Sequence, residues 1–538
     1  MYSIEVVLAM LLLVLASGYL ARMLPAWLPL PLVQIGFGAV VAGVFQEGVQ
    51  LDPHVFFLLF LPPLLFLDGW RIPKTGLFRD KTPILALALG LVLFTVVGMG
   101  LLLHWLIPAL PLPVAFALAA VVSPTDPVAL SSITARTPLP PRLRHILEGE
   151  SLLNDASGLV CFRFAVTAAL TGGFSLLSAG ATFAWLALGG IGAGVLLTLA
   201  ATRLHTRLSR SAGEEAGLPI LLSVLIPFGA YLLAEDIGAS GILAAVAAGI
   251  TMSYVELSGR ALATTRVQRT AVWDMLQFAL NGIIFVLLGE QLPGIVTRAA
   301  ADHSALALAG YALAINFGLA ALRLAWVWAT MRVLLFRAHR SGRDSIAPSF
   351  RVVAVTTLAG VRGAITLAGV LTLPLVLADG SPFPGRDLAI FLAASVILVS
   401  LLVASAVLPS LGGRIRLPAE PEVQRAEDAA RLAAARAGVA AVERAQSSLP
   451  EARRDPDLYA QAAVRVMALY DERMKRDGST GIDAEVLRRA DDAERALRLA
   501  GLQAEREVLF DMARHMRISD ELVRRLVREI DLMESRYR

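Results

Sequence analysis

Oxygen-bearing and ionisable side chains interrupt two apolar stretches of the chain. One stretch carries Ser123-Pro124-Thr125-Asp126-Pro127, and the next carries Glu150-Ser151-Leu152-Leu153-Asn154-Asp155. Ser151 and Asp155 are four residues apart and therefore share one face of a helix, with Asn154 beside them. Hard cations prefer oxygen ligands, and burial disfavours the ionised form of a carboxylate. The pattern predicts that Asp155, with Asn154 and Ser151, holds either a proton or a small cation.

The two prolines around Asp126 predict a break in the helix that contains them. Each proline removes a backbone donor and clashes with a preceding carbonyl. Unwound backbone inside a membrane is tolerated where it is packed in protein or lines a wet cavity, and its free carbonyls can bind a cation. A simple proline kink is the alternative, but Asp126 at the break favours a cation site.

Arg362 lies in a later apolar stretch, between Gly360 and Gly363. A guanidinium at that depth needs a counter-ion, and Glu150 and Asp126 are the available partners. Asp68 follows the Leu61-Pro62-Pro63 element near one end of its stretch. It either belongs to the ion site or caps the helix at the surface.

Four more polar residues lie in apolar stretches without a clear pattern. Arg163 is about 80° around the helix from Asp155 and is expected to pair with a carboxylate elsewhere. Arg323 either pairs in the same way or extends along its own side chain to the membrane surface. Asn281 and Glu290 either line a cavity or mark the outer end of their helix.

The elements that carry these residues are predicted to be membrane-spanning helices. The 538 residues are 56% hydrophobic, with a mean hydropathy of +0.67, and a spanning helix needs roughly 20 apolar residues. The stretch at residues 1–20 has no basic start and no small-residue cleavage site, so it is interpreted as a span. Thirteen candidate spans follow one another at residues 4–23, 28–46, 52–69, 83–107, 113–133, 149–171, 181–203, 217–235, 237–254, 271–292, 304–335, 351–378 and 387–410.

The basic residues between these spans predict the orientation of the chain. Loops after odd-numbered spans hold nineteen Lys and Arg residues, whereas loops after even-numbered spans hold only Arg298 and Arg386. Basic loops stay in the cytoplasm, so the N-terminus is predicted outside and the C-terminus inside. The same loops explain the isoelectric point of 9.4, and nucleic acid is not expected as a partner.

Charge divides the chain into residues 1–412, which span the membrane, and residues 413–538, a cytoplasmic helical tail. Residues 411–538 hold 24 of the 48 basic and 24 of the 44 acidic residues. Apolar residues at helical spacing predict tail helices at about 420–448, 455–476, 482–515 and 519–537. The single cysteine, Cys161, excludes an internal disulfide. We expect no cofactor, since the chain has no Walker loop, dinucleotide fingerprint or nucleophile elbow.

Four motifs together resemble the sodium/proton exchangers of the monovalent cation:proton antiporter-1 family, in their bacterial form. They are Leu61-Pro62-Pro63 with Asp68, Ser123–Pro127, Gly149–Asp155 and Gly360–Ala364. The resemblance covers essentially residues 1–410. It implies an all-α fold of about thirteen transmembrane helices in two inverted repeats, with the broken fifth and twelfth spans crossing.

The resemblance also implies a role for each residue of these motifs. Asp155 matches the essential carboxylate that binds the cation and the proton, and Asn154 marks the electroneutral branch. Ser151, Thr125, Asp126 and Asp68 would add oxygen atoms around the monovalent cation. Glu150 and Arg362 would form a structural ion pair. The family further implies a homodimer in the bacterial inner membrane, surrounded by lipid.

These observations favour exchange of Na⁺, with Li⁺ also accepted, for H⁺ by alternating access. Exchange of K⁺ for H⁺ on the same fold stays open, because cavity size and rigidity decide between cations. An intramembrane aspartyl protease would need a Gly-x-Gly-Asp motif, which is missing. A cation channel would need a continuous pore rather than one closed site.

Overall fold

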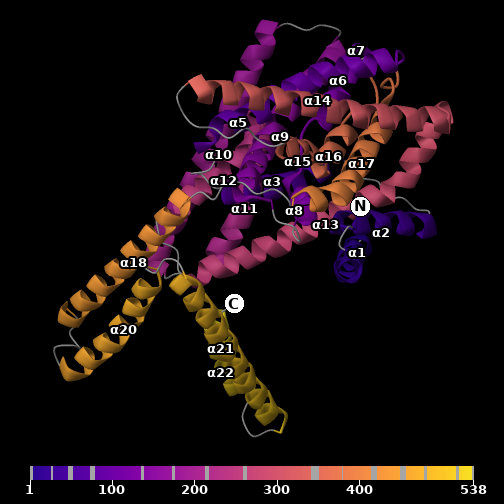
Figure 1. Cartoon of the computed structure of the whole chain (residues 1–538). Coiled ribbons are helices and arrows are strands. Elements are labelled where there is room, and N and C mark those ends of the chain that lie inside the picture. Colours follow the sequence, from indigo (N-terminus) through magenta and orange to yellow (C-terminus); the bar gives the residue numbers. More distant parts are fainter. Residues whose placement is uncertain are drawn as a thin grey trace. The chain divides into compact units, whose positions relative to one another are not determined.

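Apolar residues form helices along most of the chain in the computed structural model (Figure 1). Among the described residues, the only β-structure is an isolated bridge between Val376 and Pro382. The predicted all-α class is therefore confirmed. The structure describes residues 4–25, 28–45, 53–72, 79–134, 139–171, 176–212, 217–257, 263–340, 350–377, 380–412, 421–448, 456–477, 482–515 and 520–535.

Each predicted span corresponds to one helix or to one interrupted helix. The helices of the first six predicted spans are α1 (Ile4–Met23), α2 (Leu30–Phe45), α3 (Pro53–Arg71), α5 (Lys81–Leu85), η1 (Ala86–Leu91), α6 (Val92–Leu106), α7 (Leu112–Val122), α8 (Pro127–Thr134) and α9 (Pro141–Thr171). The remaining helices of the apolar part are α10 (Leu176–Ala212), α11 (Gly217–Asp236), α12 (Gly241–Glu256), α13 (Ala263–Asp302), α14 (Ala305–Arg340), α15 (Phe350–Leu358), α16 (Ala364–Leu371) and α17 (Arg386–Gly412).

Seven helices of the described residues are long and apolar enough to cross a membrane by length and composition. Four shorter apolar helices accompany them. The polytopic character of the chain is therefore confirmed, whereas thirteen crossings remain a prediction.

Helix pairing repeats between the two halves of the apolar part. If α1–α9 and α11–α17 are two repeats, α2 corresponds to α12 and α3 to α13. The structure packs α2 along α13 and α12 along α3, so the same pairing occurs twice with the halves exchanged. Glycine allows both close contacts, because a Cβ on Gly289 would lie 1.9 Å from the Ile35 carbonyl oxygen, and one on Gly249 would lie 2.0 Å from that of Phe66. This exchange is the pattern expected of two related repeats.

The fourth predicted span contains a π-helical segment, η1. A π-helix changes the backbone hydrogen-bonding pattern and frequently occurs near functional sites. Ser157 of α9 donates its hydroxyl to the Ala88 carbonyl over 2.7 Å, and Trp326 of α14 donates its indole N–H to the Ala86 carbonyl over 3.0 Å. The segment is therefore fixed to the two helices that carry Asp155 and Arg323.

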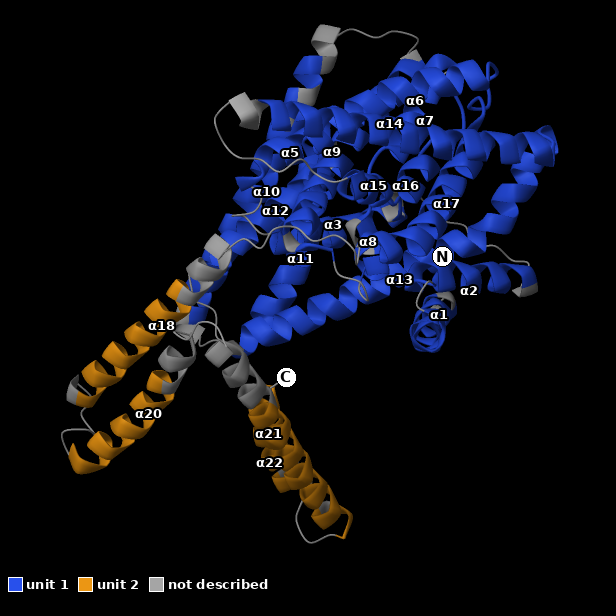
Figure 2. Ribbon diagram, viewed as in Figure 1, with its two compact units in different colours: residues 1–416 blue, residues 417–538 orange. Residues whose placement is uncertain are grey.

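The chain separates into two compact units, Met1–Arg416 and Leu417–Arg538 (Figure 2). The predicted boundary between residues 412 and 413 adjoins residues 413–420, which lie outside the described residues. The second unit contains α18 (Pro421–Ser448), α20 (Pro456–Asp477), α21 (Ile482–Arg514) and α22 (Asp520–Glu534). These helices pack as two antiparallel pairs, α18 with α20 and α21 with α22. Arg506 of α21 joins the second pair by ion pairs to Asp531, at 2.9 Å, and to Glu534.

Candidate functional site

Two broken helices meet inside the first unit. The fifth predicted span stops at Val122 and resumes at Pro127, and the twelfth stops at Leu358 and resumes at Ala364. The backbone N–H of Asp126, in the first break, donates to the carbonyl of Val361, in the second, over 2.7 Å. The carbonyl in the second break thus accepts a backbone N–H of the first break, and neither group needs a partner within its own helix. This contact agrees with the crossing that the resemblance implied.

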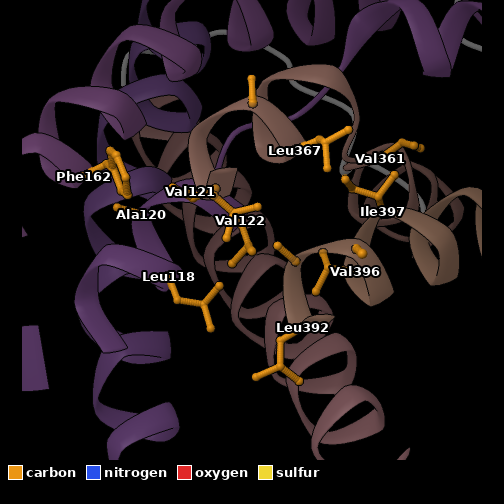
Figure 3. Close-up of a cluster of buried hydrophobic side chains, with 14 of the residues drawn as sticks. Leu118, Ala120, Val121, Val122, Phe162, Val361, Leu367, Leu392, Val396 and Ile397 are labelled. Atoms are coloured by element: carbon orange, nitrogen blue, oxygen red, sulfur yellow. The ribbon is translucent and has the colours of Figure 1, made fainter. Parts of the chain in front are cut away.

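Apolar side chains surround the crossing and exclude water from it. Val121 and Val122 at the end of α7, Val361 in the second break and Ile397 of α17 gather there (Figure 3). Each of these four side chains is at most 3% exposed. The unwound backbone is therefore packed in protein, as its position in the fold requires.

Asp126 fixes the geometry of the first break. Its Oδ1 accepts a hydrogen bond of 3.1 Å from the backbone N–H of Ala129, so it caps the N-terminus of α8. A Cβ on Gly363 would lie 1.7 Å from Asp126 Oδ2. Only glycine allows the Asp126 carboxylate to approach the second break so closely.

Ser151 and Asn154 of α9 hold Thr125 in place. Ser151 donates its hydroxyl to the Thr125 carbonyl over 2.5 Å, and Asn154 donates its side-chain N–H to Thr125 Oγ1 over 2.8 Å. Both residues are 1% exposed. The Oδ1 atom of Asn154 is buried and has no hydrogen-bond partner among the described residues. Asn154 therefore retains a free acceptor beside the break.

A small cavity lies between α3, α9, α13 and the two breaks. It encloses about 30 Å³, which is room for one or two water-sized guests. Its polar lining consists of Asp68, Thr125, Asp126, Asp155, Asn281 and Thr366, with Leu61, Leu64 and Leu65 among the apolar lining residues. Asp155 is 3% exposed. The cavity thus brings three carboxylates, two hydroxyls and an amide around a space of atomic size.

Four of the six predicted ligand residues line this cavity, namely Asp68, Thr125, Asp126 and Asp155. Ser151 and Asn154 instead lie behind Thr125 and position it. Of the two residues that the sequence left open, Asn281 lines the cavity, whereas Glu290 is not part of the lining.

The predicted ion pair between Glu150 and Arg362 is wrong. Arg323 of α14 binds both carboxylate oxygens of Glu150, with Nη1–Oε1 at 2.5 Å and Nη2–Oε2 at 2.9 Å. Glu150 is 1% and Arg323 2% exposed, so of its two alternatives Arg323 pairs with a carboxylate of another span and does not extend to the membrane surface. The planar guanidinium matches a carboxylate in this two-point geometry, which leaves Arg362 for other partners.

Arg362 binds backbone carbonyls at the breaks. Its Nε donates to the Val122 carbonyl over 3.0 Å, and its Nη1 donates to the Gly360 carbonyl. Val122 is the last residue of α7, where the helix dipole places partial negative charge. The cation of Arg362 therefore stabilises the C-terminal end of a half-helix instead of a carboxylate. Arg323 has a second contact of the same kind, to the Thr356 carbonyl at 3.1 Å.

Two residues of the site, Arg323 and Thr366, do not belong to any of the motifs. Arg323 did carry a signal, because a charge in the middle of an apolar helix needs a buried partner. Thr366 carried none, since a threonine in an apolar helix usually bonds to its own backbone. Arg163 pairs with Glu235 at 2.9 Å, as expected of a carboxylate on another span, and both side chains are partly exposed.

Comparison with known proteins identifies the family. The family model described as sodium/hydrogen exchanger, transmembrane, matches residues 8–412. The chain is a member of the sodium/hydrogen exchanger family.

The similarity of this exchanger to individual relatives extends into the tail. It is 40% identical over 540 residues to a protein of Escherichia coli named as an uncharacterized Na(+)/H(+) exchanger, covering 98% of each chain. It is 38% identical to a sodium, potassium, lithium and rubidium/H(+) antiporter of Bacillus subtilis, covering 99% of this chain and 78% of the relative. The sodium proton antiporter MjNhaP1 of Methanocaldococcus jannaschii shares the fold, with a TM-score of 0.59 and 17% identity over 76% of the exchanger and 98% of that chain.

Membership of this family makes the exchanger an antiporter and not an enzyme. The intramembrane protease is thereby set aside. The three carboxylates that line the cavity thus belong to a protein that moves ions.

Proposed function

We propose that the exchanger moves Na⁺ in one direction and H⁺ in the other through competition at Asp155. The observation that carries this proposal is the small cavity, of about 30 Å³, that Asp155, Asp126 and Asp68 line. A cation with a complete water shell does not fit, so the protein oxygens must replace most of that shell. A proton on Asp155 removes the charge that attracts the cation, and a bound cation disfavours the proton.

The roles of the surrounding residues follow from their contacts. Thr125, held by Ser151 and Asn154, offers neutral oxygen atoms beside the carboxylates, and Asn154 Oδ1 is an unused acceptor. Asp126 caps α8 and faces the cavity, so it joins the two half-helices to the ion site. Glu150 and Arg323 neutralise each other and keep the framework of the breaks in place.

We further propose Na⁺ as the main cation, with Li⁺ and K⁺ as weaker substrates. The Bacillus subtilis relative is named for sodium, potassium, lithium and rubidium, so a single oxygen-lined site of this type is compatible with several alkali ions. Asn154 beside Asp155 puts one carboxylate rather than two at this position of the helix, which supports electroneutral exchange. Alternating access would open the cavity to one side of the membrane at a time.

The proposed setting is the inner membrane of a bacterium, with the N-terminus outside and the tail in the cytoplasm. Basic loops support this orientation. A homodimer is also proposed, on the resemblance alone.

Transport by the purified exchanger in proteoliposomes tests the proposal. A pH-sensitive dye inside the vesicles should respond to added Na⁺, and the response should persist when a permeant anion such as thiocyanate collapses the membrane potential. Lower pH should raise the apparent KM for Na⁺ and leave the maximal rate nearly unchanged, because the proton competes for the same carboxylate. A larger response to K⁺ than to Na⁺ would overturn the sodium assignment.

Asp155→Asn should abolish transport, because an amide neither binds and releases a proton nor carries the negative charge for which Na⁺ and H⁺ compete. Asp236→Asn is the matched control, since Asp236 lies exposed at the end of α11, away from the cavity. The control should transport like the wild type. Exchange that survives in Asp155→Asn would refute the proposed site.

A further inference from the structure

Asn281 brings an amide into the cation cavity from α13. Its side chain is 8% exposed and lines the same space as Asp68 and Asp155. The Nδ2 atom is buried and makes no hydrogen bond to any described residue. A buried donor without a partner costs free energy, so a core position that needed only packing would be better filled by an apolar residue.

The position of Asn281 in the fold separates it from the rest of the site. Asp155 comes from α9, and Thr125 and Asp126 come from the first break. Asn281 lies on α13, which packs along α2. On the part of the wall that α3 and α13 contribute, Leu61, Leu64 and Leu65 are apolar. Asn281 and Asp68 are therefore the two polar groups that these helices offer to a cation.

The chemistry of an amide suits both states of the cavity. Its NH₂ group can donate to a carboxylate when no cation is bound, and its oxygen is a neutral ligand for a hard cation. Rotation of the side-chain amide by a half-turn exchanges the positions of the NH₂ group and the oxygen. The Nδ2 atom makes no hydrogen bond to another described residue that would fix the orientation of the amide.

We propose that Asn281 is a specificity-determining residue, which supplies a neutral oxygen to the transported alkali cation from the α13 side of the cavity. This inference rests on the proposed function of the site. In a cavity of about 30 Å³, each ligand sets the size of cation that can be held, so the loss of one ligand changes the preference between Na⁺ and K⁺.

Two substitutions separate the ligand role from packing. Asn281→Leu keeps the number and branching of the side-chain heavy atoms and removes both polar atoms, and Asn281→Ser keeps an oxygen in less volume. Asn316→Leu is the matched control, because Asn316 lies on α14 outside the cavity and donates to the Ala312 carbonyl of its own helix at 2.8 Å. Each variant is reconstituted in proteoliposomes, and its rates are measured over a range of Na⁺ and K⁺ concentrations.

Asn281→Leu should raise the apparent KM for Na⁺ about tenfold, as the loss of one contact to a charged ligand implies. The ratio of the KM values for K⁺ and Na⁺ should change about threefold or more. Asn281→Ser should recover part of both effects, and Asn316→Leu should match the wild type. If Asn281→Leu fails to fold, Asn281→Ser alone must still change the KM ratio.

Unchanged KM values and an unchanged ratio in the folded Asn281 variants would overturn the inference. Lower rates or lower melting temperatures with the wild-type ratio would overturn it as well, since they indicate packing alone. Asp155→Asn separates the proposed role of Asn281 from the proposed function of the whole site. If it is inactive while the Asn281 variants behave like the wild type, only the role of Asn281 fails. If it transports, the proposed function fails.

Discussion

Buried and exposed ion pairs of this exchanger have different physical roles, although both link neighbouring helices. Glu150 and Arg323 are at most 3% exposed and bind through two parallel hydrogen bonds. Arg163 and Glu235 are separated by a similar distance but remain partly exposed to solvent. Removal of one partner from the buried pair leaves a charge without a partner and without water. In the exposed pair, water solvates the charge that remains.

Arg323→Ala should therefore destabilise the protein by about 3–5 kcal/mol, because it leaves Glu150 charged and without a partner. Arg163→Ala, the matched control, should cost no more than about 1 kcal/mol. Unfolding of the detergent-solubilised protein, followed by intrinsic fluorescence, measures both changes.

The double substitution Glu150→Gln with Arg323→Gln should cost less than the two single substitutions together, because it leaves no unpaired charge. Additive losses would mean that the two side chains act independently, and the assigned pair would then be wrong.

At the scale of the element, the breaks of the fifth and twelfth spans carry the geometry of the site. The Asp126 carboxylate occupies the place where any residue other than glycine at position 363 would put its Cβ. Since Asp126 also caps α8 and lines the cavity, a shift of its carboxylate changes the half-helix and the ion site together.

Gly363→Ala should lower the transport rate about tenfold or more, since displacement of a site group by about 1 Å has effects of this size. Gly310→Ala in α14 is the matched control, because a Cβ there meets no other atom within 4 Å. The control should keep its activity and gain up to about 1 kcal/mol of helix stability. Equal activity of the two variants, measured as dye response to Na⁺, would contradict the close contact of Asp126 with Gly363.

The positions of the breaks were predicted better than the partners of the charged side chains around them. Pro124 and Pro127 are local signals that place the first break, whereas the second break, around Arg362, was implied by the family resemblance. The partner of Glu150 depends on which of two arginines reaches it, and that is decided by the packing of α14. Arg362, moreover, is satisfied by carbonyls that exist only because α7 ends at Val122.

The π-helical segment η1 had no signal of its own. Residues 86–91 are apolar like their neighbours, so their π-helical backbone and its contacts with Ser157 and Trp326 are visible only in the structure. By contrast, the motifs did identify four of the cavity residues, namely Asp68, Thr125, Asp126 and Asp155. Asn281 was left open and Thr366 was not identified, since neither belongs to a motif.

For the molecule as a whole, charge separates a charge-poor membrane part from a tail with 24 basic and 24 acidic residues. The tail helices pair with one another, α18 with α20 and α21 with α22, within a unit of their own. The residues that line the proposed ion site all belong to the first unit, and no described tail residue is among them.

A variant that ends at Gly412 should therefore keep the exchange activity of the full chain within about threefold, since the site and the packing around it remain complete. Proteoliposomes with equal amounts of folded protein provide the comparison, and the full chain is the control. Loss of exchange in a truncated protein that still inserts and purifies would show that the tail contributes to transport itself.

The distribution of basic residues predicts which face of the protein each connection occupies. Loops after odd-numbered spans should lie in the cytoplasm together with the tail, whereas the turn between α13 and α14 should lie outside. The chain has a single cysteine, Cys161, which packs against the apolar core. A Cys161→Ser background therefore allows one new cysteine at a time to report its side of the membrane.

In that background, Ser304→Cys should react with a membrane-impermeant maleimide in intact cells, because Ser304 is exposed in the turn that follows an even-numbered span. Gln446→Cys, exposed on α18 of the tail, should react only after the cells are made permeable. The two variants control for each other, since both positions are accessible once the membrane is open. The reverse pattern would invert the topology, and labelling of both in intact cells would mean an even number of crossings between Ser304 and the tail. Either result would contradict the assignment of the basic loops to the cytoplasm.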